Sequence, residues 1–83
     1  MKATVKVINR KRGTYAAEID DTGEFVIFRV LNASEAEVDD RISHPDFYRT
    51  GFETFENLTQ DLSMAVSVEN IYGASLVKQK GPH

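Results

Sequence analysis

Apolar and polar residues alternate in three short stretches of the chain. In residues 2–8, positions 3, 5 and 7 are apolar and positions 2, 4 and 6 are polar, which assigns Val7 to the apolar face. Residues 15–19 and 62–68 alternate in the same way. A period of two is typical of a strand that buries one of its faces. We therefore expect three strands, the first two joined as a hairpin by a loop that contains Gly13.

Another stretch, residues 25–31, is rich in β-branched and aromatic residues and favours a strand more strongly. The preceding Asp20-Asp21-Thr22-Gly23 has the composition of a turn. Because the charge of Arg29 belongs on the outside, Phe25 and Ile27 are expected to share that outer face. The opposite face is expected in the core and carries Val26, Phe28 and Val30.

Residues 32–61 do not follow this alternation. A connection of about 30 residues is too long for a bare loop, so we expect a helical turn or a short strand inside it. Four aromatic residues of this segment are expected to pack in the core and anchor loops at one barrel end: Phe47, Tyr48, Phe52 and Phe55.

The C-terminal part of the chain is expected to complete the sheet. We predict a turn at residues 70–73, a fifth strand at residues 74–77 and a flexible tail at residues 78–83. A single domain over residues 1–77 follows. The predicted fold class is all-β: a small five-stranded antiparallel barrel of the OB type, with a long loop between strands three and four. An SH3-like barrel is the alternative.

The composition excludes several classes of protein. A chain of 83 residues supplies one hydrophobic core. Without cysteine, the protein has no disulfide, thiolate metal site or cysteine nucleophile, which suits a reducing compartment. No apolar run approaches the roughly 18 residues of a membrane span, and the N-terminus does not resemble a signal peptide. We therefore expect a cytoplasmic protein without a membrane partner.

Charge is distributed unevenly along the chain. The net charge is −3, but residues 1–13 carry five basic residues and no acid, whereas residues 14–40 carry eight acids and one arginine. Because salt screens charges over about 8 Å, a local basic group attracts phosphate in spite of the acidic total. The first hairpin is therefore a candidate nucleic-acid site. The candidate site residues are Lys6, Arg10, Lys11, Arg12, Tyr15, Phe25 and Arg29.

Other groups of reactive residues form no catalytic or metal-binding pattern. The acids of residues 35–40 lack the ligand spacing of a calcium-binding loop and are expected to be a solvated segment. Ser43-His44-Pro45-Asp46 contains three residue types of a catalytic triad, but neighbours in sequence do not converge into a relay. We expect no cofactor, no metal and no enzymatic activity.

Three segments of the chain follow an order that is typical of one family. Residues 5–13 read Val-Lys-Val-Ile-Asn, two basic residues and Arg-Gly, similar to Val-Lys-Trp-Phe-Asn, two variable residues and Lys-Gly. Residues 20–28 contain an acidic turn before Phe-Val-Ile-Phe, similar to an acidic turn before Phe-Val-His-Phe. Residues 51–69 are similar to a last loop and fourth strand. The family is the cold-shock domain, and the resemblance implies an OB fold that binds single-stranded RNA or DNA.

The chain departs from this family where the family stacks bases. Val7 stands at the tryptophan position, Thr14-Tyr15-Ala16 replaces Phe-Gly-Phe, and Ile27 stands at the histidine position. Stacking on an aromatic ring contributes about 1 to 3 kcal/mol per base, so nucleic-acid binding is expected to be weak. The alternative hypothesis is a protein-interaction module, a monomer or weak dimer, that binds a partner or itself. It would use the acidic segment or the surface of Phe25 and Ile27.

Overall fold

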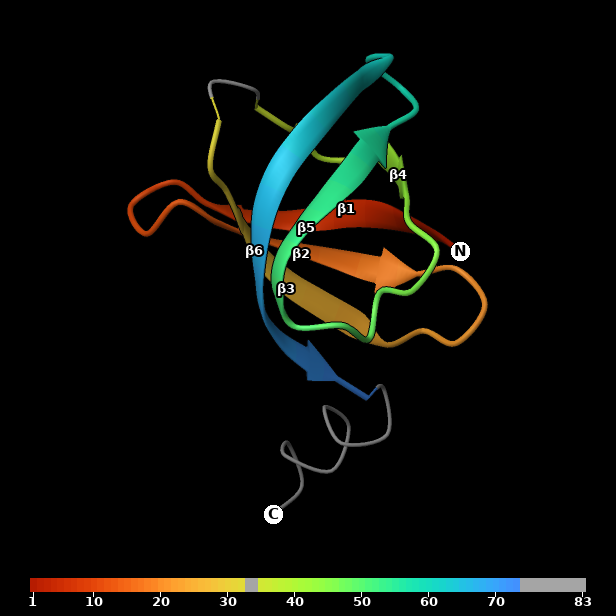
Figure 1. Ribbon diagram of the computed structural model, residues 1–83. Coiled ribbons are helices and arrows are strands. Elements are labelled where there is room, and N and C mark those ends of the chain that lie inside the picture. The colour runs from red at the N-terminus through yellow and green to blue at the C-terminus, as the bar shows by residue number, and fades with distance from the viewer. Residues whose placement is uncertain (33–34, 74–83) are drawn as a thin grey trace.

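The computed structural model describes residues 1–32 and 35–73 and shows a closed barrel (Figure 1). Its six strands are β1 (Lys2–Asn9), β2 (Thr14–Ile19), β3 (Phe25–Val30), β4 (Arg41–Ser43), β5 (Gly51–Asn57) and β6 (Leu62–Tyr72). The described residues contain no helix that is long and apolar enough to cross a membrane.

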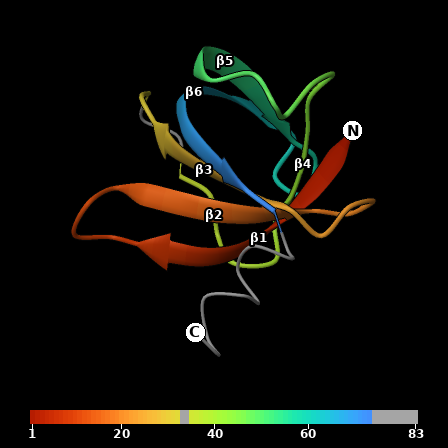
Figure 2. The ribbon, with the colours of Figure 1, turned by 90° about the horizontal axis from the view of Figure 1, so that it is seen from below.

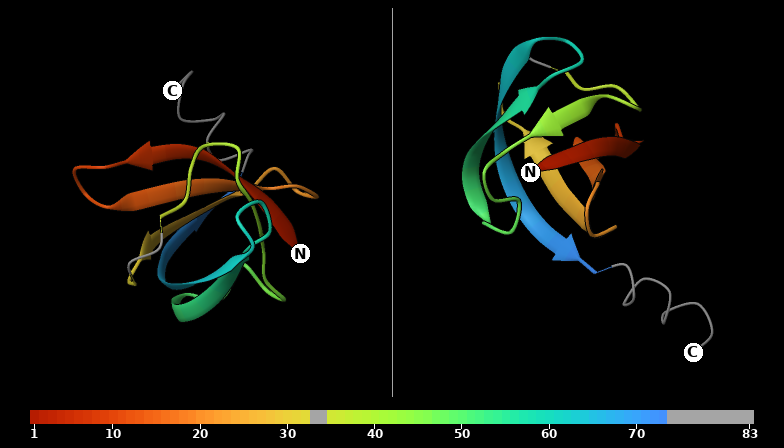
Figure 3. Two further views of the ribbon diagram at one scale, coloured as in Figure 1. Left: turned by 90° about the horizontal axis from the view of Figure 1, so that it is seen from above. Right: turned by 90° about the vertical axis from the view of Figure 1, so that its right-hand side faces the viewer.

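The barrel consists of two antiparallel three-stranded meanders joined along both edges. The strand order is β1-β2-β3-β6-β5-β4, and β4 pairs with β1 to close the barrel. Figure 3 shows the short β4 between β1 and β5. The all-β prediction is confirmed, but the predicted count of five strands is wrong. The long segment between residues 32 and 61 contributes two strands, because three residues of β4 suffice to bridge β1 and β5.

A β-bulge in β1 changes the facing of its second half. Ala3 and Val5 are fully buried, as predicted, and pair with Ile19 and Ala17 of β2. The register then shifts between Val5 and Val7, because one extra residue is accommodated on β1. Val7 is therefore 58% exposed, and the prediction that it joins the core is wrong.

The facing of β3 is largely as predicted from Arg29. Val26 and Phe28 are fully buried, and Arg29 is exposed on the other face. Phe25 and Ile27 lie half-buried on that outer face. The strand is therefore amphipathic, with an outer surface that is partly apolar.

β6 extends further than its alternating pattern. The predicted turn at residues 70–73 is wrong, because Ile71 and Tyr72 continue the ladder opposite Val26 and Phe25. A register shift in the β3–β6 pairing absorbs one additional residue near the middle of β6. The predicted strand at residues 74–77 and tail at residues 78–83 lie outside the described residues.

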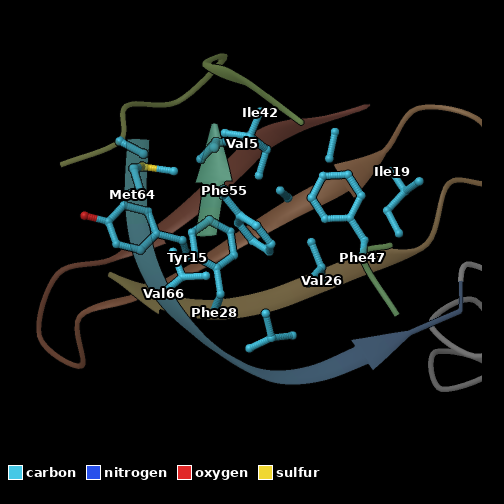
Figure 4. Packing of buried hydrophobic residues seen from close by; sticks show 14 residues of the cluster. Val5, Tyr15, Ile19, Val26, Phe28, Ile42, Phe47, Phe55, Met64 and Val66 are labelled. Atoms are coloured by element: carbon cyan, nitrogen blue, oxygen red, sulfur yellow. The ribbon is translucent and has the colours of Figure 1, made fainter. Parts of the chain in front are cut away.

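The core is a cluster of aromatic and aliphatic side chains inside the barrel (Figure 4). Phe55 makes edge-to-face contacts with Phe28 and Phe47, at centroid distances of 5.0 and 5.1 Å. The predicted core roles of Phe47 and Phe55 are therefore confirmed, whereas Tyr48 and Phe52 are exposed.

The connection from β3 to β4 runs back along β1. The Val5 N–H donates to the Asp40 carbonyl (2.9 Å), and the Asp39 N–H donates to the Val5 carbonyl (2.8 Å). Asp39 has a positive φ of 76° at this point. These bonds fix the connection beside β1 and place its acidic residues near the basic hairpin.

Candidate nucleic-acid interface

The outward-facing side chains of β1, β2, β3 and β6 form one continuous surface, which we call the outer face. Its central row follows the strand register as Val7, Ala16, Ile27 and Asn70. One flanking row contains Thr4, Glu18, Phe25 and Tyr72, and the other contains Asn9, Thr14, Arg29 and Ser67. The central row is thus apolar except for Asn70, the row with Arg29 is polar, and the row with Glu18 is mixed because it also carries Phe25 and Tyr72.

The β1–β2 hairpin carries the basic residues beyond one end of the outer face (Figure 2). Arg10, Lys11 and Arg12 are all exposed at its tip. The tip is ordered by a hydrogen bond from the Arg12 N–H to Asn9 Oδ1 (3.2 Å) and by Gly13, which has a φ of 69°. Because Gly tolerates this angle, the turn can project three basic side chains into solvent.

The basic residues differ in how far their charges are already balanced. Arg10 lies 3.5 Å from Glu37, and Arg29 lies 2.8 Å from Glu69. Within residues 1–32 and 35–73, no ion pair involves Lys6, Lys11 or Arg12. An exposed ion pair contributes only about 0 to 1 kcal/mol to stability, so a phosphate can replace Glu37 or Glu69 as the partner of its arginine at small cost.

Tyr15 lies inside the barrel and does not belong to the interface. Its side chain is 8% exposed, and its ring stacks on Phe28 at 5.5 Å with an interplanar angle of 13°. Figure 4 shows it among the core side chains near Met64 and Phe55. A ring so enclosed presents no face to a base, so Tyr15 is removed from the candidate site.

Phe52 is the aromatic residue that the sequence interpretation missed. It is 81% exposed and lies opposite Ser67, which in turn pairs with Arg29. Since neighbouring strands are about 4.8 Å apart, Phe52 lies roughly 10 Å from Arg29 along one row. Its spacing from the buried Phe55, three positions on in β5, could have indicated that the two rings face opposite ways.

The other end of the outer face is acidic. Glu18 lies on β2, and Asp20, Asp21 and Glu24 lie in or beside the β2–β3 turn. Arg41 pairs with Asp20 at 2.5 Å. The Tyr48 hydroxyl donates to Glu24, and this hydrogen bond raises the pKa of Tyr48 above its ordinary 10.0.

His44 and Glu53 form a partly buried pair at the barrel end. His44 Nε2 lies 2.8 Å from Glu53 Oε1, and His44 Nδ1 accepts the Asp46 N–H at 2.9 Å. Because Nδ1 is an acceptor, the neutral ring donates through Nε2 to the carboxylate. Both nitrogens are thus used to hold the loop after β4, which is a structural role.

Asp40 is the centre of a buried polar cluster beside β4. Its Oδ2 accepts hydrogen bonds from Asn57 Nδ2 (2.9 Å), Gln60 Nε2 (2.6 Å) and the Glu37 N–H (2.9 Å). Burial raises the pKa of Asp40, but the bonds from Asn57, Glu37 and Gln60 lower it, and the result lies below the ordinary 3.8. These donors are amides, so the cluster fixes structure.

Two remaining features are weak candidates for binding. A shallow hollow is lined by Lys2, Arg41, Leu58 and Thr59, but the Arg41 guanidinium is already paired with Asp20. Among the described residues, no group of three or more His, Cys, Asp or Glu side chains could hold a metal ion. The outer face is therefore the principal candidate surface.

Comparisons with known proteins find no matching family model, no matching curated protein and no matching solved structure.

Proposed function

We propose that this protein is a noncatalytic binder of single-stranded nucleic acid that uses the basic end of the outer face. One observation carries the proposal: the exposed hairpin tip adjoins a row in which Arg29 and the exposed ring of Phe52 lie two strands apart. Basic side chains beside aromatic faces are the usual elements of a single-strand site.

The proposed mechanism combines two kinds of contact: basic side chains bind phosphates, and an aromatic ring stacks on a base. Lys6, Lys11 and Arg12 attract phosphates, and Arg29 contacts the backbone after exchanging Glu69 for a phosphate. Phe52 stacks one base, and the half-buried Phe25 offers a smaller apolar contact. One full platform with a few phosphate contacts accounts for weak binding, since each stacked base contributes about 1 to 3 kcal/mol.

The OB assignment and the cytoplasmic location belong to the same proposal. The OB type is supported by the motif order along the chain and by the long β3–β4 connection that runs beside β1. An SH3-like barrel is the competing assignment. The cysteine-free composition supports a reducing compartment such as the cytoplasm.

An NMR titration of the labelled protein with short single-stranded oligonucleotides at low salt tests the function. Amide shifts are expected at Lys6, at residues 10–13, at Arg29 and at Phe52, and added salt should reverse them. Shifts that are absent at millimolar oligonucleotide, or that are unaffected by salt, would contradict nucleic-acid binding. A duplex of the same sequence is the control, because its stacked bases cannot reach Phe52.

A further inference from the structure

An apolar strip crosses the outer face, and of its side chains the proposed nucleic-acid contacts use only Phe25. The strip consists of Val7, Ala16 and Ile27 of the central row and of Phe25 and Tyr72 of the flanking row. Val7 is 58% exposed and Tyr72 is 39% exposed. Ala16, Ile27 and Phe25 lie half-buried between them on adjacent strands. Contiguous exposed apolar groups on a sheet are typical of a surface that is covered by another molecule.

Opposite charges flank this apolar strip along the strand direction. The basic end consists of the hairpin tip, residues 10–12, whereas Lys6 lies in the β1 bulge beside the central row. The acidic end consists of Glu18 and the turn with Asp21, and the exposed Lys2 lies beside this turn, since the Asp20 N–H donates to the Lys2 carbonyl. Figure 2 shows the hairpin tip and the β2–β3 turn at opposite ends of β2. In the part of the chain that the structure describes, neither Lys11 and Arg12 nor Glu18 and Asp21 take part in an ion pair.

We infer that the outer face packs against the outer face of a second copy of this chain, with the strands of the two copies running in opposite directions. A twofold axis that lies in the interface, perpendicular to the strands, places β2 over β2 and the central row over itself. The same rotation places the basic end of each copy over the acidic end of its partner. Charge complementarity is thus satisfied twice in one closed dimer.

The charge pattern selects a second copy as the occupant. A polyanion that covered the whole outer face, beyond its basic end, would be repelled by Glu18 and Asp21, and a basic partner of the same extent would be repelled by the hairpin tip. A copy rotated by 180° meets opposite charge at both ends and an apolar strip in the middle. Packing of two twisted sheets face to face is also an ordinary arrangement for β-proteins.

The dimer stands independently of the proposed function, although it has a consequence for it. The hairpin tip is needed for both contacts. If nucleic acid binds as proposed, an oligonucleotide and the second copy compete for the basic end, and self-association regulates access to it.

Sedimentation velocity over a range of protein concentrations, combined with charge reversal, tests the dimer. One variant is Lys11→Glu/Arg12→Glu, and the other is Glu18→Lys/Asp21→Lys. In a dimer of either variant alone, like charges face each other at both ends. That dimer should therefore dissociate at least about tenfold more readily than the wild-type dimer. Mixing the two variants should restore a dimer, because both ends of the mixed pair are again complementary. Asp61→Lys, in the β5–β6 turn, is the control and should leave the dimer unchanged.

Several outcomes would overturn the inference. A wild-type protein that stays monomeric at millimolar concentration has no such interface. A dimer that ignores both charge reversals, or a mixture that does not reassociate, uses a different surface. Val7→Glu places a charge in the central row at an exposed position and should also dissociate the dimer; its failure to do so would exclude the apolar strip. Amide spectra establish that each variant is folded.

Binding of an oligonucleotide to Glu18→Lys/Asp21→Lys separates the two proposals, because this variant keeps its basic end. Oligonucleotide binding without a wild-type dimer would refute the dimer alone. A dimer without oligonucleotide binding would refute the proposed function alone.

Discussion

Two charged regions of the molecule differ in where their partners come from: the buried cluster around Asp40 and the exposed tip of the β1–β2 hairpin. Asp40 is 5% exposed, and amide donors surround its Oδ2. Lys11 and Arg12 are exposed, and no acid within the described residues pairs with them. The first region has its partners within the fold, whereas the second can accept partners from outside.

This difference separates a structural role from a binding role. A buried carboxylate whose donors are fixed by the chain loses stability when any member of the cluster is removed. Exposed cations that are unpaired contribute little to stability but attract an anionic partner. Substitutions in the Asp40 cluster should therefore change unfolding, and substitutions at the hairpin tip should change association.

The largest effect is expected from Asp40→Ala. The substitution leaves the Asn57 and Gln60 amides without their acceptor and should lower the free energy of unfolding by about 3 kcal/mol. Urea denaturation followed by circular dichroism measures this loss. Asp21→Ala, at an exposed turn position, is the matched control and should stay within about 0.5 kcal/mol of the wild type. Equal effects of the two substitutions would refute a structural role for the cluster.

The outer face could be predicted from the sequence where strand period and charge agreed. Arg29 correctly assigned Phe25 and Ile27 to the outside, because a period of two leaves no other choice. The prediction for Val7 is wrong because a β-bulge adds one residue to β1 and reverses which face the following side chains occupy. A bulge depends on how β1 pairs with β2, and the alternation of residues within β1 alone does not show that pairing.

The polar cluster and the closure of the barrel depend on contacts between distant residues. Asp40 and Asn57 are 17 residues apart, and their bond exists only once β4 and β5 pair. The sequence places Asp40 in an acidic segment that is expected to be solvated, and this expectation is wrong for Asp40, which is buried. The three-residue β4 was likewise too short to show a period, although the length of its segment indicated that some element lay inside it.

The second-largest effect concerns association with nucleic acid. Lys11→Glu/Arg12→Glu should weaken oligonucleotide binding by about a hundredfold at low salt, because two phosphate contacts become repulsions. The plot of log affinity against log salt should become shallower by about 1.4, at about 0.7 for each lost contact. Fluorescence anisotropy at several salt concentrations measures both quantities. Unchanged affinity, with an unfolding transition equal to that of the wild type, would remove the hairpin from the binding site.

Phe52→Ala should produce a smaller loss that is confined to binding. Removal of one stacking platform is expected to weaken oligonucleotide binding by about tenfold, within the range of about 1 to 3 kcal/mol per stacked base. The free energy of unfolding should change little, because the ring is 81% exposed. The salt dependence should stay that of the wild type, which distinguishes stacking from phosphate contact. Thr54→Ala, on the same face of β5, is the control. A changed salt slope for Phe52→Ala would contradict the stacking role.

The smallest effect is expected from acid, and it returns to Asp40. Burial raises the pKa of this carboxyl while its three hydrogen bonds lower it, so the opposing causes leave a pKa that lies below 3.8. A pKa that is lower in the folded state than in the unfolded state stabilises the fold above the unfolded value, and this stabilisation is lost as the pH falls through the folded value. The stability advantage of the wild type over Asp40→Asn should therefore be constant above about pH 5 and should shrink below 3.8. Urea midpoints of the two proteins across this range measure the difference, since their other carboxyls titrate alike. An advantage that grows as the pH falls would mean that burial outweighs the hydrogen bonds and that Asp40 is protonated more readily in the folded state.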